Sequence, residues 1–315
     1  MEKTRQFIES LGFPSRDLND LPTSTKTFPD GAQYRVEIPS VEGPASFEAV
    51  VEACKQYDVY IQRISQGSGI MLLTDEDLNG MAEIGRRENL EVSLFVGPRG
   101  TFDITPMRLA SAGQIQGLRV QGMDQLVYSL EDIKRACRAG IRSILVADEG
   151  LVWLVNEAKK SGELPSDLVV KISVQIAQSN PVSIKLMEQI GADTYNVPTD
   201  LTLAKLAAIR KVIDIPIDIY IEVPDDVGGY IRHYDIPEII RVAAPVYIKF
   251  GLRNSPNIYP SGTHLEPTSI ALCKERVRRA RIGLDMIKRY APHLKTSEKG
   301  AAGLGVPVDA DDKWM

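Results

Sequence analysis

The sequence predicts an α/β protein with a (β/α)8 barrel, also called a TIM barrel, over residues 34–295. Short runs of β-branched residues alternate there with longer amphipathic segments, which is the pattern of a parallel sheet with crossover helices. Eight such units in about 260 residues match the usual size of this barrel. The first expected strand is followed by SVEGPASFEA rather than by G-x-G-x-x-G, which disfavours a doubly wound nucleotide-binding sheet.

The individual elements follow from local patterns. The expected strands span 34–41, 59–66, 90–96, 143–147, 168–176, 194–197, 217–223 and 246–250. The expected helices include 47–57, 74–89, 129–140, 180–191, 201–213 and 270–290. Several of these helices follow Ser, Thr, Asp or Asn and end at Gly, which are the residues that cap helix ends.

Three segments lie outside this regular pattern. Residues 1–33 predict an N-terminal helix and an arm rich in Pro, Asp, Ser and Thr, positioned to cover the barrel floor. Residues 296–315 are Gly-rich and then acidic, which predicts a mobile tail, with Trp314 available to a neighbouring subunit. The connection 99–122 is long for a barrel loop, so it is a candidate lid. Because the arm and tail offer exchangeable contacts, we expect a homo-oligomer.

Composition excludes several functional classes. The net charge of -5 gives no support for a nucleic-acid-binding surface. The three cysteines are scattered through expected helices, so we expect neither a disulfide framework nor an iron–sulfur cluster, and the compartment is predicted to be reducing. No apolar run has the length of a membrane span or a signal peptide, which predicts a cytoplasmic protein.

Strand alternation predicts an unusually polar barrel interior. One parity of each strand is apolar and faces the helices, so the other parity faces the barrel centre. The inward residues are Arg35, Glu37, Lys171, Gln175, Asn196, Asp218, Tyr220, Glu222, Tyr247 and Lys249. The second strand is ambiguous, because Gln62 and Arg63 have opposite parities. Buried charges must be paired, since an isolated one costs several kcal/mol.

The inward residues divide into two layers. We expect the deeper Arg35, Lys171 and Asp218 to form a structural network. The upper layer (Glu37, Gln175, Asn196, Glu222 and Lys249) lies nearer the carboxyl ends of the strands, where barrel enzymes place their chemistry.

The upper layer supplies the candidate catalytic residues Glu222, Lys249 and Glu37. Glu37 and Glu222 could act as bases or as ligands of a divalent metal, of Mg or Mn character because the chain has only three histidines. Alternatively, Glu222 forms an ion pair with Lys249. Lys249 could also bind a substrate carboxylate, or form a Schiff base if burial lowered its pKa.

The connections after the strands supply candidate substrate-binding residues. The long loop GLRNSPNIYPSGTHLEP contributes Arg253, Asn254 and His264, at a barrel position where anions often bind. The other candidates are Gln66, Arg99, Gln175 and Asn196. The ISQGSG turn at Gln66 could present backbone amides to an oxyanion. Asp148 and Glu149 could serve the site or cap the helix that follows them.

Several stretches together resemble the peptidase U32-like barrel family: RVEIPSV, ISQGSGIMLLTD, FVGPRG, NVPTDLTL and KFGLRNSPNIYPSGTHLE. The resemblance spans most of the chain and implies a barrel fold. It also implies a link to collagenase-like peptidases, or to hydroxylation of RNA or quinone precursors with cysteine-bound iron–sulfur clusters. This chain lacks the clustered cysteines and an identifiable peptidase nucleophile or zinc site.

The leading hypothesis is therefore an enzyme that acts on an anionic small molecule by lyase, isomerase or hydrolase chemistry at the carboxyl face of the barrel. Lys249 and Arg253 would bind the anion. One alternative is a U32-like protein acting on a peptide or RNA, and another is a non-catalytic binding barrel.

Overall fold

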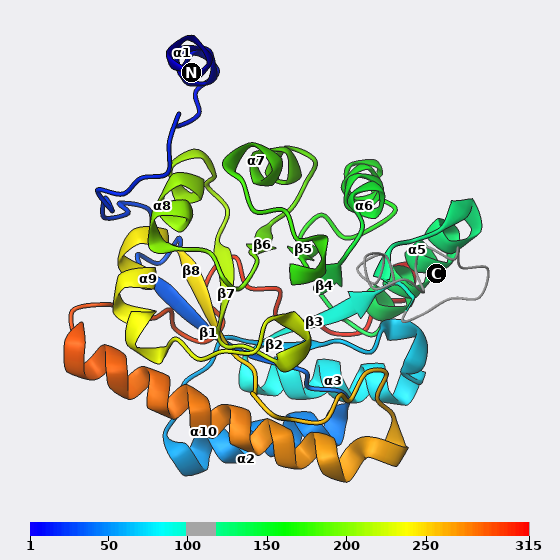
Figure 1. The fold of residues 1–315 in the computed structure, drawn as a ribbon. Helices are drawn as coiled ribbons and strands as arrows, with labels where there is room; N and C mark the ends of the chain where they lie inside the picture. Colours follow the sequence, from blue (N-terminus) through cyan, green and yellow to red (C-terminus); the bar gives the residue numbers. More distant parts are fainter. Residues whose placement is uncertain (99–117, 315) are drawn as a thin grey trace.

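The computed structural model describes residues 1–98 and 118–314, and it confirms the predicted barrel. Eight parallel strands close in sequence order, β1 pairing with β2 and onward to β8, which pairs back with β1 (Figure 1). The strands are β1 (Tyr34–Pro39), β2 (Arg63–Gln66), β3 (Glu91–Val96), β4 (Ser143–Val146), β5 (Val169–Ile172), β6 (Thr194–Asn196), β7 (Ile217–Glu222) and β8 (Val246–Phe250).

Helices surround the barrel, and their apolar faces pack on the outward parity of the strands. They are α2 (Pro44–Tyr57), α3 (Asp75–Glu88), α5 (Gly122–Arg138), α6 (Glu149–Ser161), α7 (Pro181–Gln189), α8 (Leu203–Val212), α9 (Ile236–Ala243) and α10 (Glu266–Tyr290). Side-chain caps start several of them: Thr74 accepts a hydrogen bond from the Asp77 amide, and Asp148 accepts one from the Leu151 amide. Of the two roles open to Asp148, the structure thus shows the capping one.

The strands are shorter than the sequence predicts, chiefly at β5. This strand ends at Ile172, and a 3-10 turn over Val174–Ile176 replaces the expected extended residues. The Ser173 hydroxyl accepts a hydrogen bond from the Gln175 amide and so starts this turn. As a result Gln175 projects from a turn at the carboxyl end of the barrel rather than from the strand.

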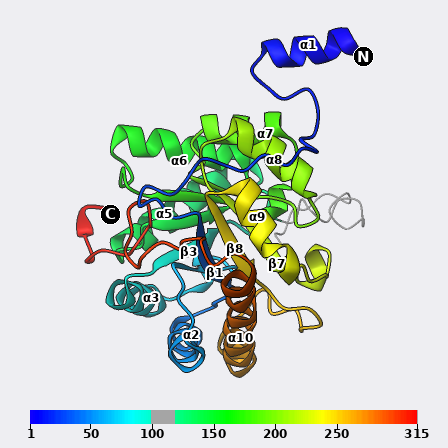
Figure 2. The ribbon, with the colours of Figure 1, turned by 90° about the vertical axis from the view of Figure 1, so that its left-hand side faces the viewer.

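The N-terminal segment combines a detached helix with an arm that contacts the barrel. Helix α1 (Glu2–Ser10) lies apart from the ring of helices (Figure 2). Further along, Ser24 donates a hydrogen bond from its amide to the Arg241 carbonyl. Phe28 then packs edge to face on Tyr247, with the ring centroids 5.3 Å apart. The arm therefore reaches the barrel floor, meaning the end formed by the amino termini of the strands.

The C-terminal segment 296–314, for which the sequence predicts a mobile tail, packs on the barrel floor. Thr296 forms an isolated β-bridge with Tyr34. The backbone carbonyl of the buried Ser297 accepts a hydrogen bond from the Gln62 side chain. Trp314 is 9% exposed and belongs to the hydrophobic core of its own chain rather than being free for a neighbouring subunit. The composition of the segment is misleading because its glycines permit close backbone packing as well as disorder.

Candidate functional site

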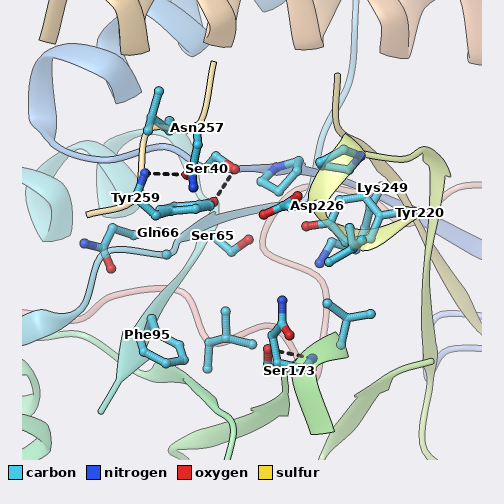
Figure 3. Close-up of a pocket in the computed structure, with 18 of the residues that line it drawn as sticks. Ser40, Ser65, Gln66, Phe95, Ser173, Tyr220, Asp226, Lys249, Asn257 and Tyr259 are labelled. Carbon is cyan, nitrogen blue, oxygen red and sulfur yellow. Dashed lines mark hydrogen bonds between the residues drawn. The ribbon is translucent and has the colours of Figure 1, made fainter. Parts of the chain in front are cut away.

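A cavity of about 260 Å³ opens at the carboxyl end of the barrel (Figure 3). Serine, glutamine, asparagine and tyrosine side chains form much of its wall, together with the apolar Phe95 and Leu145. Its polar and charged wall residues include Ser40, Ser65, Gln66, Ser173, Gln175, Asn196, Tyr220, Asp226, Lys249, Asn257 and Tyr259. The cavity therefore offers hydroxyl and amide groups to a polar ligand at the position where barrel enzymes act.

Lys249 lies among the lining residues with only 3% of its surface exposed. Its Nζ donates a hydrogen bond to Asn196 Oδ1 at 2.5 Å and lies 3.2 Å from Glu37 Oε1. The ring of Tyr220 lies beside it, with its centroid 4.3 Å from Nζ. These contacts from β6, β1 and β7 fix the ammonium in position, so the predicted lysine is brought into the cavity.

Below Lys249, a layer of completely buried charges fills the barrel centre. Lys171 Nζ lies 2.5 Å from Glu37 Oε2 and 2.7 Å from Asp218 Oδ2. Arg63 contacts both of these carboxylates and also Glu91, whose Oε1 is 2.8 Å from Arg63 Nε. With Lys249 included, three cations meet three carboxylates, so the layer is neutral as a whole. This is the condition under which buried charges are tolerated.

Lys171 and Glu37 are among the members of this layer with displaced pKa values. Burial lowers the pKa of Lys171 to about 8, because it outweighs the attraction of Asp218 and Glu37. Burial alone would raise the pKa of Glu37, but Lys171, Lys249 and Arg63 overcome it and hold that pKa well below its usual range. Ser65 also donates a hydrogen bond to Glu37 Oε1 at 2.7 Å. Glu37 is thus an ionised and fully engaged counter-ion rather than a ready base.

The structure rearranges the two predicted layers. Lys171 and Asp218 do form a deep network, but Arg63 and Glu37 belong to it and Arg35 does not. Arg35 instead lies at the barrel floor, where it donates hydrogen bonds to Ser297 and Tyr247. The ambiguity of the second strand is resolved in favour of Arg63, since Gln62 precedes β2 and donates to the Ser297 carbonyl at the barrel floor.

Glu222 does not line the cavity. The pairing of β7 with β8 shifts register between Tyr220 and Glu222, which breaks the alternation that predicted an inward side chain. Glu222 Oε1 accepts a hydrogen bond from the Arg253 amide at 3.0 Å, and Oε2 lies 3.6 Å from Arg279 Nε on α10. The expected pairing of Glu222 with Lys249 is therefore wrong, because Lys249 pairs with Glu37.

The loop after β8 places its predicted residues outside the cavity. Arg253 forms an ion pair with Asp225, with Nε 2.8 Å from Oδ1, and donates a hydrogen bond to the Gly229 carbonyl. Asn254 donates its amide to Asp225 Oδ2 at 2.5 Å, and His264 is exposed. None of the three is among the lining residues. The same loop supplies Asn257 and Tyr259 to the cavity wall instead.

The ISQGSG turn lines the cavity, but three of its backbone amides already have an acceptor. Gly67 and Ser68 each donate a backbone hydrogen bond to the Glu42 carboxylate at 3.0 Å, and the Gln66 amide oxygen accepts from Gly69. A Cβ at Gly67 would lie 2.6 Å from the Tyr259 ring, so glycine is needed for the ring to pack there. This turn shapes the wall rather than presenting those amides to an oxyanion.

Of the other predicted binding residues, Gln66, Gln175 and Asn196 line the cavity. Arg99, and most of the candidate lid 99–122, lie outside the described residues. Sequence reasoning missed Ser40, Asp226 and Tyr259, which line the cavity. The hydroxyl groups of Ser40 and Tyr259 hydrogen-bond to each other (Figure 3). Strand parity could not indicate them, because all three follow the strands in irregular backbone.

Within residues 1–98 and 118–314, no cluster of three or more His, Cys, Asp or Glu side chains has the arrangement of a metal site. Glu37 and Glu222, proposed together as metal ligands, face different surroundings, since Glu37 lies within the barrel centre and Glu222 contacts α10. In the same part of the chain, no helix is long and apolar enough to span a membrane.

Comparisons with known proteins identify the fold alone. No family model and no curated protein matches the chain. Among solved structures it is similar to a U32 peptidase, with 16% identity, coverage of 64% of this chain and 73% of the other, and a TM-score of 0.40. This similarity agrees with the resemblance suggested by the sequence, and at such low identity it extends to the barrel fold.

Two further solved structures share the barrel. A truncated 3-deoxy-D-arabino-heptulosonate 7-phosphate synthase from Thermotoga maritima is 15% identical, with 88% of this chain and 95% of that chain covered and a TM-score of 0.45. A dihydrodipicolinate synthase is 11% identical, with 82% and 79% covered and a TM-score of 0.45. A fold does not fix an activity, so function has to be argued from the site.

Proposed function

We propose that the protein is an enzyme whose active site is the cavity at the carboxyl end of the barrel, and that it acts on a small carboxylate or other oxyanion. The observation that carries this proposal is the Lys249 ammonium, held among hydroxyl and amide side chains at the base of an open cavity. Of its three N–H groups, Asn196 and Glu37 engage two, and the third is proposed to serve the ligand.

The chemistry that suits this arrangement is proton transfer next to a carbonyl group. Asp226 is exposed and lines the same cavity, and Figure 3 draws it on the same side of the view as Lys249 and Tyr220. In the proposed step the Asp226 carboxylate takes a proton from the carbon, the C–H electron pair moves into the adjacent carbonyl, and Lys249 stabilises the resulting enolate oxygen. The proton then returns from Asp226 to carbon, as in isomerases and lyases.

Hydrogen–deuterium exchange at carbon tests this proposal whatever the final product is. The protein is incubated in D2O with a panel of 2-oxo and 2-hydroxy carboxylates, and loss of each C–H signal is followed by proton NMR. We expect catalysed exchange for at least one compound, and its loss in Asp226→Asn and Lys249→Met. Lys288→Met, which removes an exposed lysine on α10, is the matched control and retains exchange.

Two outcomes would contradict the proposal. Absence of exchange across the panel would favour a binding barrel over an enzyme of this class. Exchange that survives in Lys249→Met would show that the chemistry lies elsewhere.

A further inference from the structure

A second cavity, of about 450 Å³, lies at the opposite end of the barrel and is separate from the proposed active site. It is lined by the amino-terminal ends of several strands, by the arm residue Phe28 and by the C-terminal segment 302–306. Three cationic side chains meet there from different elements: Arg35 from β1, Arg142 from the start of β4 and Lys159 from α6. The exposed Ser166 and Asp167 also line it, so it is open to solvent.

Arg35 brings a buried positive charge to this cavity. It is 1% exposed, yet among the residues that the structure describes no carboxylate forms an ion pair with it. Its donors reach neutral oxygens of Ser297, Tyr247 and Ala302 at 2.8–3.0 Å, and its guanidinium lies 4.0 Å from the Phe28 ring centroid. Three donors are used, so a guanidinium with five N–H groups keeps two for a further acceptor.

The other two cations have carboxylate partners only at 3.5 Å, although each also donates to backbone carbonyls: Arg142 to those of Cys137 and Ile141, and Lys159 to that of Leu168. Arg142 Nε lies 3.5 Å from Asp167, whose side chain is 66% exposed. Lys159 Nζ lies 3.5 Å from Asp193 Oδ2, which already accepts the Val170 amide. Exposed or shared carboxylates at this separation contribute little stabilisation, because water competes with them. Asp167 and Asp193 line the cavity as well, so its three cations exceed its carboxylates by one positive charge.

The C-terminal segment closes one side of this cavity. A Cβ at Gly305 would lie 2.4 Å from the Arg142 carbonyl oxygen, so only glycine lets the segment pass so close to β4. The Ala302 carbonyl accepts a hydrogen bond from Arg35 at 2.8 Å. The C-terminal segment and Arg35 thus stabilise each other's position.

From this arrangement we infer that the barrel floor contains a second ligand site, which binds a phosphate monoester through Arg35, Arg142 and Lys159. A tetrahedral dianion can meet cations from three directions at once, whereas a carboxylate offers one planar pair of oxygens to a single fork of donors. The volume lies in the range of small-molecule sites, so it accommodates an organic group beyond the phosphate. This site is independent of the proposed enzymatic function.

Arg35 also has a structural task, since it holds the C-terminal segment, so the decisive variants are at Arg142 and Lys159. Phenyl phosphate, inorganic phosphate and acetate are titrated separately into the full-length protein by calorimetry. We expect phenyl phosphate to bind best and acetate worst. Arg142→Gln and Lys159→Gln should each weaken phenyl phosphate binding roughly tenfold or more. Lys159→Arg should keep most of the affinity.

Lys160→Gln is the matched control, because it removes the same charge from the neighbouring position of α6, where the side chain is 62% exposed. Equal weakening in Lys160→Gln would indicate a non-specific charge effect and overturn the proposal. Loss of binding in Lys249→Met, with Arg142→Gln and Lys159→Gln unaffected, would assign the anion to the other cavity and overturn it as well. Absence of phenyl phosphate binding, or a preference for acetate that Arg142→Gln and Lys159→Gln reduce, would also refute it.

Discussion

Lys171 and Lys249 lie on the inside of the same barrel and share the Glu37 carboxylate, but their surroundings differ. Lys171 is completely buried between Glu37 and Asp218, and each of its carboxylate contacts is 2.7 Å or shorter. Lys249 has one carboxylate at 3.2 Å, a neutral amide and an aromatic ring, and it lines an open cavity. The charge of Lys171 is balanced within the protein, whereas Lys249 is the lysine that we propose binds a ligand.

The difference shows why an inward-facing charge is not by itself a sign of function. In the deep layer every charge has an oppositely charged partner, as burial demands. At the cavity, solvent or a ligand can help to balance the charge, so a cation there can bind a ligand. This contrast predicts that the two lysines respond in opposite ways when stability and ligand binding are measured separately.

Removal of the deep lysine is expected to have the largest effect. Lys171→Met removes the hydrogen-bond donor of Glu37 and Asp218, which even a deprotonated Lys171 amine would keep, and leaves Arg63 as the shared cation of these two carboxylates. Loss of one partner from a buried pair costs about 3–5 kcal/mol, so the free energy of unfolding, measured by urea denaturation, should fall by that amount.

The double variant Lys171→Met/Glu37→Gln restores neutrality to the layer. Its loss of stability should therefore be smaller than the sum of the two single losses. If the losses simply add, the two residues are not coupled and the deep layer does not act as a unit.

The titration of Lys171 should be visible as a pH dependence of stability. Its pKa is about 8 in the folded protein and 10.5 ordinarily, so between these values the unfolded chain binds more protons. The contribution of Lys171 to the free energy of unfolding therefore rises with pH across this window, on the order of 3 kcal/mol, and the burial penalty is fully present below pH 8.

Carbon-13 NMR of labelled lysine side chains measures this titration directly, with Lys171→Arg used to assign the resonance. We expect a midpoint below those of the exposed lysines. A Lys171 midpoint at or above 10.5 would show that its two carboxylates outweigh burial, and stability would then not rise in this window.

Removal of Lys249 should lower the stability less than removal of Lys171 and should affect function more. Lys249→Met leaves Glu37 with Lys171, Arg63 and Ser65, and water in the cavity can compensate in part. We expect the free energy of unfolding to fall by less than about 2 kcal/mol, while ligand-dependent stabilisation disappears. A loss of stability as large as that of Lys171→Met would mean that the two lysines have the same structural role.

The sequence predicts the barrel and much of its interior, because both follow from local regularity. Alternation in β1, β5 and β8 places Glu37, Lys171 and Lys249 correctly on the inside. Caps such as Thr74 and Asp148 mark helix starts by hydrogen bonds within three residues of each other. These signals depend on neighbouring residues alone.

The walls of the two cavities were not predictable in the same way. Ser40 and Tyr259 meet across the fold, 219 positions apart in the chain, and their contact depends on loops without a repeating pattern. The tail 296–314 resembles a disordered segment in composition, although its glycines serve close packing. Alternation also fails where a strand is irregular, which is the reason that Glu222 was misplaced.

Substitution of Glu222 should change the free energy of unfolding least of all. It also tests whether the register shift in β7 keeps this side chain out of the cavity. Glu222→Gln keeps an oxygen for the Arg253 amide and loses only the attraction of the half-buried Arg279 at 3.6 Å. We expect a change of less than about 1 kcal/mol in the free energy of unfolding and no change in carboxylate exchange in D2O. Abolition of exchange, with stability retained, would place Glu222 with Lys249 in the active site, as strict alternation along β7 predicts. Lys249 would then differ from Lys171 by having the Glu222 carboxylate beside it in the active site, in spite of the register shift between Tyr220 and Glu222.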